Sequence, residues 1–215
     1  MAGMSLRERK KAQTRLLIAD IAMGLFAERG FDGVTVAEVA RAADVSVNTV
    51  FNYFPTKEDL FFDREAEVED SLAAVVRARR PGESVIGALR RWVVEGFDTD
   101  LWATGLWPEA ADFFRLVDDS PSLRARTREL GERTENALAR TLATETGAGP
   151  DDPMPSLVAG LVAGSRHAVL AEARRRLLAG EPFDVVKTWA RDAYQRAFDL
   201  LENGVPRNYG VTEVR

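Results

Sequence analysis

Apolar side chains recur at helical spacing along almost the whole chain. In residues 6–29, Ile18, Ala22, Leu25 and Phe26 fall on one face, and Gly30 follows as a favourable helix C-cap. The sequence shows no alternation of the kind that strands require. The pattern therefore predicts an all-α protein of about nine helices. Besides two short helices between residues 35 and 56, the expected helices cover residues 6–29, 57–79, 83–97, 108–117, 121–146, 155–179 and 182–203.

Three helix-start signals lie close together in the first third of the chain. Thr35 and Thr56 are each followed three residues later by an acidic residue, as in a capping box, and Ser46 is a favourable N-cap. This spacing allows two short helices joined by a tight turn, and then a third helix. It predicts a helix-turn-helix over about residues 35–54, in which the second short helix enters the major groove of DNA.

A helix that reads DNA needs an apolar inner face, side chains that reach base edges, and flanking groups that hold phosphates. The inner face is supplied by Val39, Ala40, Val45, Val50 and Phe54. The residues expected to reach bases are Val47, Asn48, Thr49, Phe51 and Asn52, and those expected to hold phosphates are Thr35, Ser46, Tyr53 and Lys57. Taken singly, the two cap residues could serve only as caps, and the two aromatic residues only as packing.

The charge distribution fits DNA binding better than the net charge of −5 does. Residues 1–60 hold eight basic and eight acidic residues, so the acidic excess lies in the rest of the chain. Near the N-terminus a basic cluster faces a single acid, Glu8, and suits phosphate contacts. A solvated N-terminus is the alternative reading. The cluster consists of Arg7, Arg9, Lys10, Lys11 and Arg15.

The composition argues against several other functions. The chain has no cysteine, which excludes disulfides and thiolate metal sites and suits a reducing cytoplasm. A single histidine excludes a His-rich metal site. The sequence also has no apolar segment long enough to predict a membrane span, and no pattern that predicts an export signal. We therefore expect a cytoplasmic protein with no metal, no cofactor and no membrane partner. An all-helical enzyme is the alternative from another class, but the sequence has no Gly-rich phosphate loop and no cluster of metal ligands. A third reading is a DNA-binding activator, or an architectural protein that binds no ligand.

Two segments carry a family resemblance, Ala27-Glu-Arg-Gly-Phe-Asp-Gly-Val-Thr35 and Val45-Ser-Val-Asn-Thr-Val-Phe-Asn-Tyr-Phe-Pro-Thr-Lys-Glu-Asp-Leu60. With them, residues 7–63 resemble, without a gap, the DNA-binding domain of the TetR family of bacterial repressors. The chain departs from the family pattern at Asn48, where many members have glycine, and at Phe51, where many have tyrosine. The resemblance implies a homodimer that binds a palindromic operator on double-stranded DNA and is released by a small-molecule effector.

The break at Arg80-Pro81-Gly82 separates two expected domains. The DNA-binding domain is expected over residues 11–72, the ligand-binding and dimerisation domain over 83–204, and a flexible tail over 205–215. In the second domain, aromatic residues cluster near Gly and Pro and suggest an apolar ligand site. The resemblance there is to a subgroup that binds acyl-CoA-like ligands, which implies a small hydrophobic effector. The residues expected at the ligand are Phe97, Trp102, Trp107, Phe114 and His167, and a plain helical core is the alternative for each aromatic residue.

Apolar stripes on the last two expected helices predict the dimer seam. Two such helices from each partner would form a four-helix bundle. The alternative is that both stripes fold into the core of a single chain. The residues expected at the seam are Leu161, Val169, Val186, Trp189, Ala193 and Ala197.

Overall fold

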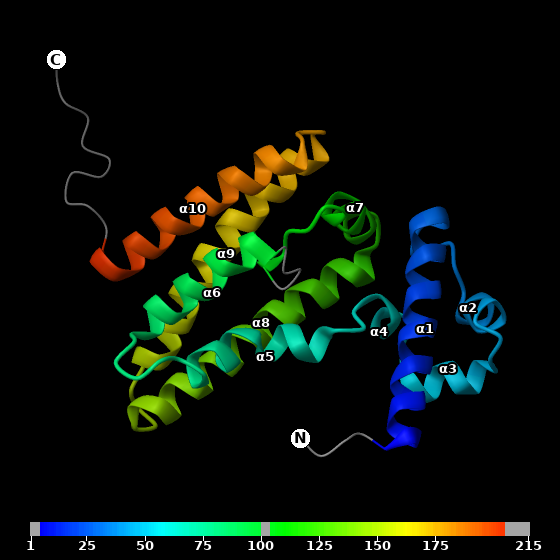
Figure 1. Cartoon of the computed structure of the whole chain (residues 1–215), viewed down its shortest axis with the longest axis horizontal. Coiled ribbons are helices and arrows are strands. Elements are labelled where there is room, and N and C mark those ends of the chain that lie inside the picture. Colours follow the sequence, from blue (N-terminus) through cyan, green and yellow to red (C-terminus); the bar gives the residue numbers. More distant parts are fainter. Residues whose placement is uncertain (1–4, 100–103, 205–215) are drawn as a thin grey trace. The chain divides into compact units, whose positions relative to one another are not determined.

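The computed structural model describes residues 5–99 and 104–204, and within these ranges the chain forms ten α-helices and no strand (Figure 1). The predicted all-α class is therefore confirmed. The helices are α1 (Leu6–Arg29), α2 (Val36–Ala42), α3 (Val47–Tyr53), α4 (Lys57–Phe61), α5 (Glu65–Arg77), α6 (Val85–Thr99), α7 (Ala110–Asp119), α8 (Pro121–Thr146), α9 (Met154–Leu178) and α10 (Phe183–Asn203). The expected tail, 205–215, and the expected ligand residue Trp102 lie outside the described residues.

The predicted helix starts of the first third are confirmed. Thr35 and Thr56 each form a reciprocal capping box, and the Ser46 hydroxyl accepts from the backbone N–H of Thr49 at 3.0 Å. The turn between α2 and α3 passes through Asp44 at φ 53°, a left-handed conformation that aspartate tolerates better than most residues. These local hydrogen bonds fix where the short helices begin, and hence the helix-turn-helix.

The single helix expected over residues 57–79 is wrong, because the chain breaks between α4 and α5. At Phe62 the backbone leaves helical geometry (φ −101°, ψ 47°). The Arg15 guanidinium donates to the carbonyl of Asp63 at 2.6 Å, a carbonyl that a continuous helix would use itself. Both Phe61 and Phe62 also contact the ring of Phe113, with centroid distances of 4.7 Å and 6.2 Å. Tertiary packing therefore overrides a helical sequence pattern at this point.

Contacts divide the chain into two units. The first, here called the head unit, contains the residues up to Glu65 together with Asp112–Glu129, and the remainder forms the body unit. In the head unit, Leu116, Val117 and Leu123 join the apolar core of α1 to α4. Residues 112–129 thus pack with the head, although they lie within the sequence range expected for the second domain.

Polar contacts also tie residues 112–129 into the head unit. The Ser120 hydroxyl donates a hydrogen bond of 3.2 Å to the carboxylate of Asp32, which lies in the loop between α1 and α2. Arg126 pairs with Asp59 of α4 at 3.2 Å and with Glu65 at 2.8 Å, and all three side chains are largely shielded from solvent. The head unit therefore includes a second, distant segment of the chain.

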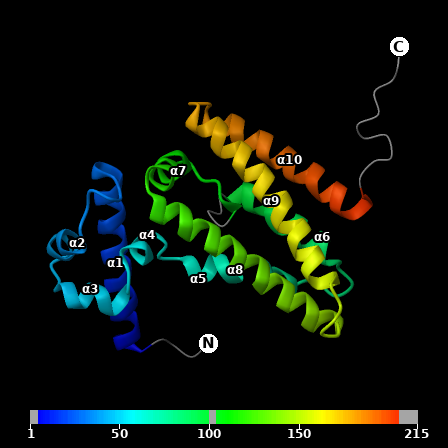
Figure 2. The same ribbon diagram turned by 180° about the vertical axis from the view of Figure 1, so that it is seen from behind.

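In the body unit, α10 packs against both α9 and α6. Helices α9 and α10 are joined by a short turn and run antiparallel, as Figures 1 and 2 show from opposite sides. The buried residues on these helices include Leu89, Phe97, Ala159, Val186 and Tyr194. None of the helices among the described residues is both long and apolar enough to cross a membrane.

Candidate nucleic-acid interface

Helices α1, α2 and α3 form a packed trihelical arrangement that leaves one side of α3 outside. Ile18, Ala22 and Phe26 of α1 are fully buried, and α2 contributes Val39. In α3 only Val50 is buried. Of the predicted inner face, Val50 anchors α3 from within the helix and Phe54 is buried directly after it. The exposed side chains of α3 are Val47, Asn48, Phe51 and Asn52, while Thr49 and Tyr53 are partly buried.

The exposed side of α3 combines apolar and amide groups. Val47 is 39% exposed and Phe51 45%, which is high for large apolar side chains. Asn48 and Asn52 are also exposed, and neither amide makes a hydrogen bond to any described residue. An asparagine amide can donate and accept together at an adenine edge, and an apolar side chain can meet a thymine methyl. This surface is chemically suited to reading a major groove.

The hydroxyl groups predicted to hold phosphates are engaged within the head unit. Thr35 donates its hydroxyl to Glu38 at 2.7 Å, and Ser46 and Thr49 share a hydrogen bond of 2.8 Å between their hydroxyls. The backbone N–H of Thr35 and then the guanidinium of Arg29 lower the pKa of Glu38 to about 2. Glu38 therefore stays ionised and holds the cap of α2. The structure gives these hydroxyls a capping function, and their contact with phosphates remains a prediction.

Tyr53 and Lys57, also predicted for phosphates, lie next to aromatic groups of the core. Tyr53 is partly buried against the head core, and the Lys57 ammonium lies 4.3 Å from the ring centroid of Phe31. A cation over a ring face is attracted to it, which orients the lysine. Tyr53 is the last residue of α3 and Lys57 the first of α4, and their contact with phosphates remains a prediction.

Arg15 has a function that the sequence reasoning missed. It was grouped with the basic cluster, but its guanidinium donates to the carbonyls of Tyr53 (2.9 Å) and Asp63 (2.6 Å) and lies 4.2 Å from the ring of Phe54. Arg15 thus supplies a hydrogen-bond donor to the carbonyl of the last residue of α3 and stabilises the break after α4. Its position three residues before the buried Ile18, on the same face of α1, is the signal that could have identified it.

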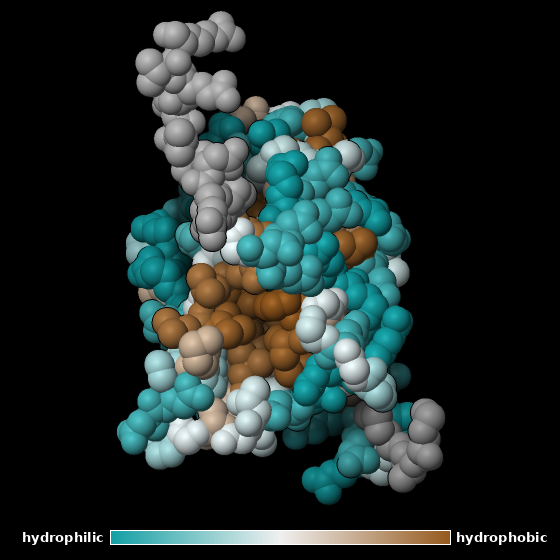
Figure 3. Space-filling model, turned by 90° about the vertical axis from the view of Figure 1, so that its left-hand side faces the viewer, coloured by the Kyte–Doolittle hydropathy of each residue, from teal (hydrophilic) through white to brown (hydrophobic). Residues whose placement is uncertain are grey.

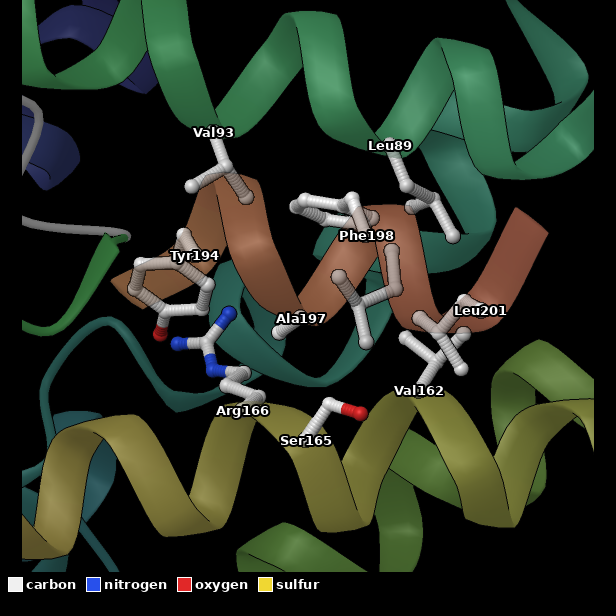
Figure 4. A pocket seen from close by; sticks show the side chains of 10 residues that line it. Leu89, Val93, Val162, Ser165, Arg166, Tyr194, Ala197, Phe198 and Leu201 are labelled. Atoms are coloured by element: carbon white, nitrogen blue, oxygen red, sulfur yellow. The ribbon is translucent and has the colours of Figure 1, made fainter. Parts of the chain in front are cut away.

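The body unit contains a small apolar cavity of about 20 Å³, room for roughly one water molecule (Figure 4). At one end Arg166 and Tyr194 point towards each other, and burial raises the pKa of Tyr194 to about 12. Its lining consists of Leu72, Leu89, Val93, Val162, Ser165, Arg166, Tyr194, Ala197, Phe198 and Leu201.

The residues predicted for a ligand do not gather around this cavity. Phe97 is buried beside Tyr194, at 5.9 Å between ring centroids, and Phe114 belongs to the head unit. His167 is exposed on α9, and Trp107 is partly buried but does not line the cavity. The described members of that set are dispersed, so the cavity is built from other residues.

The residues predicted for the dimer seam fall into two groups. Val169 and Val186 are buried, at 6% and 0% exposure, and therefore belong to the core of the body unit. Leu161 is 61% exposed. Trp189, Ala193 and Ala197 are partly buried, with Trp189 beneath the guanidinium of Arg176 and Ala197 at the cavity.

The trihelical head and the outward side of α3 define a helix-turn-helix DNA-binding protein. Residues 18–63 match the family described as "Bacterial regulatory proteins, tetR family", and residues 83–206 match the "MftR C-terminal domain". The chain belongs to the TetR family of bacterial transcriptional regulators.

Two relatives are themselves named as regulators. The chain is 29% identical over 161 residues to the transcriptional regulator TcmR of Streptomyces glaucescens, covering 70% of this chain and 68% of that protein. It is 25% identical over 211 residues to the putative mycofactocin biosynthesis regulator MftR of Mycobacterium tuberculosis, covering 93% and 94%.

Solved structures share the fold at low identity. A putative TetR-family regulator from Mesorhizobium loti is 21% identical with a TM-score of 0.58, over 88% of this chain and 95% of that one. FadR of Bacillus subtilis in complex with stearoyl-CoA is 18% identical with a TM-score of 0.53, over 89% and 99%. A SmeT–triclosan complex is 16% identical with a TM-score of 0.58, over 94% and 96%.

Replacing Asn48 by alanine is expected to reduce discrimination between the operator and other DNA. Asn48 is exposed at the start of α3, and one paired amide–base contact contributes about 1–3 kcal/mol of discrimination. The measurement is a titration of the variant with operator and with random-sequence DNA. Lys57→Ala is the comparison, because loss of a group predicted to hold a phosphate should weaken binding to both DNAs alike. Parental discrimination in Asn48→Ala would show that α3 does not read bases through this residue.

Proposed function

We propose that the protein is a ligand-released repressor that acts in the cytoplasm and binds a palindromic operator as a homodimer. The observation that carries the proposal is the outward side of α3, where two unengaged amides stand beside exposed Val47 and Phe51. Water hydrates exposed amides well, so what marks this side is that two amides with free donors and acceptors and two large apolar side chains lie together on one short helix. A base-pair edge in the major groove offers chemistry that matches both kinds of group.

The dimer seam is proposed along one exposed stripe of α9. Its members, here called the α9 stripe, are Met154, Leu157, Leu161, Gly164 and Ala168, all exposed and spaced at helical intervals. Because α9 and α10 run antiparallel, the first half of this stripe lies at the same end of the pair as Leu200, which is 42% exposed. Figure 3 shows a contiguous apolar area, rimmed by hydrophilic residues, on the side where α10 ends. An apolar surface of this kind is typical of a partner interface.

The proposed effector is a small hydrophobic molecule, acyl-CoA-like in having an apolar chain and a polar head. The cavity walls are apolar, while Ser165, Arg166 and the Tyr194 hydroxyl supply polar groups. Two proteins of the same fold were solved with stearoyl-CoA, which joins a long apolar chain to a charged head, and with triclosan, which is largely apolar. At about 20 Å³ the cavity is far too small for such a molecule, so a ligand must bind an expanded conformation of the body unit.

This size difference makes a switch possible, because the free energy of ligand binding is gained only in the expanded conformation. A ligand that fits only the expanded conformation necessarily shifts the population towards it. Leu72 of α5 lines the cavity, and in the chain α5 follows α4 after the break at residues 62–64. We infer that opening of the cavity displaces α5, and through it α4 and the recognition helix. The two heads of the dimer then lose the spacing of about 34 Å that successive major grooves require.

The experiment is a pair of titrations with palmitoyl-CoA and, separately, with triclosan. Operator affinity is measured with and without each compound, and compound affinity with and without operator. A coupling of about 1–3 kcal/mol predicts a 5- to 150-fold loss of operator affinity and the same loss in the reciprocal titration. Equal compound affinities with and without operator would refute ligand release. Equal affinities of the parent protein for operator and for random-sequence DNA would refute the DNA-binding proposal itself.

A further inference from the structure

Helix α1 extends well ahead of the region that matches the family. The match begins at residue 18, whereas α1 begins at Leu6 behind a complete capping box. In that box the Ser5 backbone N–H donates to Glu8 at 2.7 Å, and the Glu8 N–H donates to the Ser5 hydroxyl at 3.2 Å. Residues 6–17 therefore form the first turns of α1, about three of them, with an ordered start.

These first turns of α1 carry positive charge without internal partners. The side chains of Arg7, Arg9, Lys10 and Lys11 are all exposed and make no ion pair or hydrogen bond to any described residue. The one acid among them, Glu8, is committed to the cap. Surface bases without partners are common, so charge alone does not distinguish this segment. What distinguishes this segment is its position relative to α3.

A hydrogen bond from Arg15 sets the position of the first turns of α1 relative to α3. Arg15 donates to the carbonyl of Tyr53, the last residue of α3, at 2.9 Å. Lys11 and Arg7 precede Arg15 by one and two helical turns on the same side of α1. At 1.5 Å per residue they lie about 6 Å and about 12 Å further along the helix axis. Figures 1 and 2 both show the first turns of α1 running past the end of α3.

We propose that Arg7 and Lys11 bind DNA phosphates beyond the groove that α3 enters, so that each head contacts a longer stretch of DNA than its recognition helix covers. Arg7 lies about 12 Å from Arg15 along α1, a distance comparable to the major-groove width of about 12 Å, so its side chain is expected to reach the strand that borders the groove. The helical start holds these charges in place before DNA arrives, which reduces the entropy lost on binding. This inference rests on the proposed function of α3.

The test compares the parent with the double variant Arg7→Gln/Lys11→Gln. Glutamine keeps helix propensity and removes charge. Operator affinity is measured over a series of salt concentrations on two duplexes, one ending at the outer edges of the half-sites and one with ten more base pairs on each side. The control is Arg128→Gln/Arg140→Gln, which changes two exposed arginines of α8 whose side chains likewise have no partner among the described residues.

The parent is expected to bind the longer duplex more tightly, and the double variant to bind both duplexes alike. The slope of log affinity against log salt should decrease by about 0.9 for each phosphate that the variant no longer neutralises. The control should keep the parental slope and the parental preference for the longer duplex. A parent indifferent to duplex length, or a double variant with the parental slope, would overturn the proposal. Failure of the DNA-binding proposal looks different, because the parent would then not distinguish operator from random DNA on either duplex.

Discussion

Leu161→Arg is expected to convert the protein into a monomer and to remove most of its operator affinity. Leu161 is 61% exposed in the middle of the α9 stripe, so an arginine there places a charge in the proposed seam without disturbing the core of the body unit. Loss of simultaneous binding to two half-sites removes an avidity gain of about 10²–10⁴. Sedimentation analysis gives the oligomeric state, and a titration with operator gives the affinity.

The matched control is Leu16→Arg, which changes a leucine of similar exposure (56%) on α1, far from the α9 stripe in the sequence. This variant should have the oligomeric state of the parent. A Leu161→Arg variant that sediments as the parent does would exclude the α9 stripe as the seam. Attention would then turn to the partly buried residues of α10, among them Trp189 and Ala193.

Phe61→Ala is expected to destabilise the head unit by about 3–5 kcal/mol, the usual cost of removing a buried phenyl ring. Phe61 is 3% exposed, and its ring contacts those of Phe31 (5.9 Å), Phe62 (4.9 Å) and Phe113 (4.7 Å). The ring of Phe61 therefore packs against three parts of the head unit, namely the loop after α1, the break after α4, and helix α7. Chemical denaturation followed by a probe in the head unit measures the loss.

Phe51→Ala provides the contrast for this prediction. Phe51 is 45% exposed on α3, so its removal should change the free energy of unfolding by no more than about 0.5 kcal/mol. It should instead weaken operator binding, because the ring belongs to the outward side of α3. Equal destabilisation by the two substitutions would contradict the assignment of Phe61 to the core and of Phe51 to the surface.

Sequence reasoning succeeded where structure depends on neighbours along the chain. The caps at Thr35, Ser46 and Thr56 are made by residues three positions apart, so the residue types alone indicate them. The break after α4 was missed because it depends on Arg15 and Phe113, which are distant in the sequence. No local pattern contains that information.

The body unit was harder to predict for a related reason. Helix α9 is apolar on several sides, so periodicity alone cannot separate buried Val169 from exposed Leu161. The cavity draws its lining from four helices, α5, α6, α9 and α10, for example Leu72 and Val93, whereas the predicted site rests on aromatic residues close in sequence. Which faces of these helices meet is a tertiary property.

The composition of the head core has a consequence for engineering hybrid regulators. Leu116, Val117 and Leu123 complete the core around Phe31 and Phe61, and Ser120 closes it with a hydrogen bond to Asp32. A chimera that exchanges only the residues up to Glu65 with a homologue therefore joins two halves of a core that were not selected together. To transfer operator specificity, we expect that both segments of the head unit must be exchanged together, residues 112–129 as well as the amino-terminal helices.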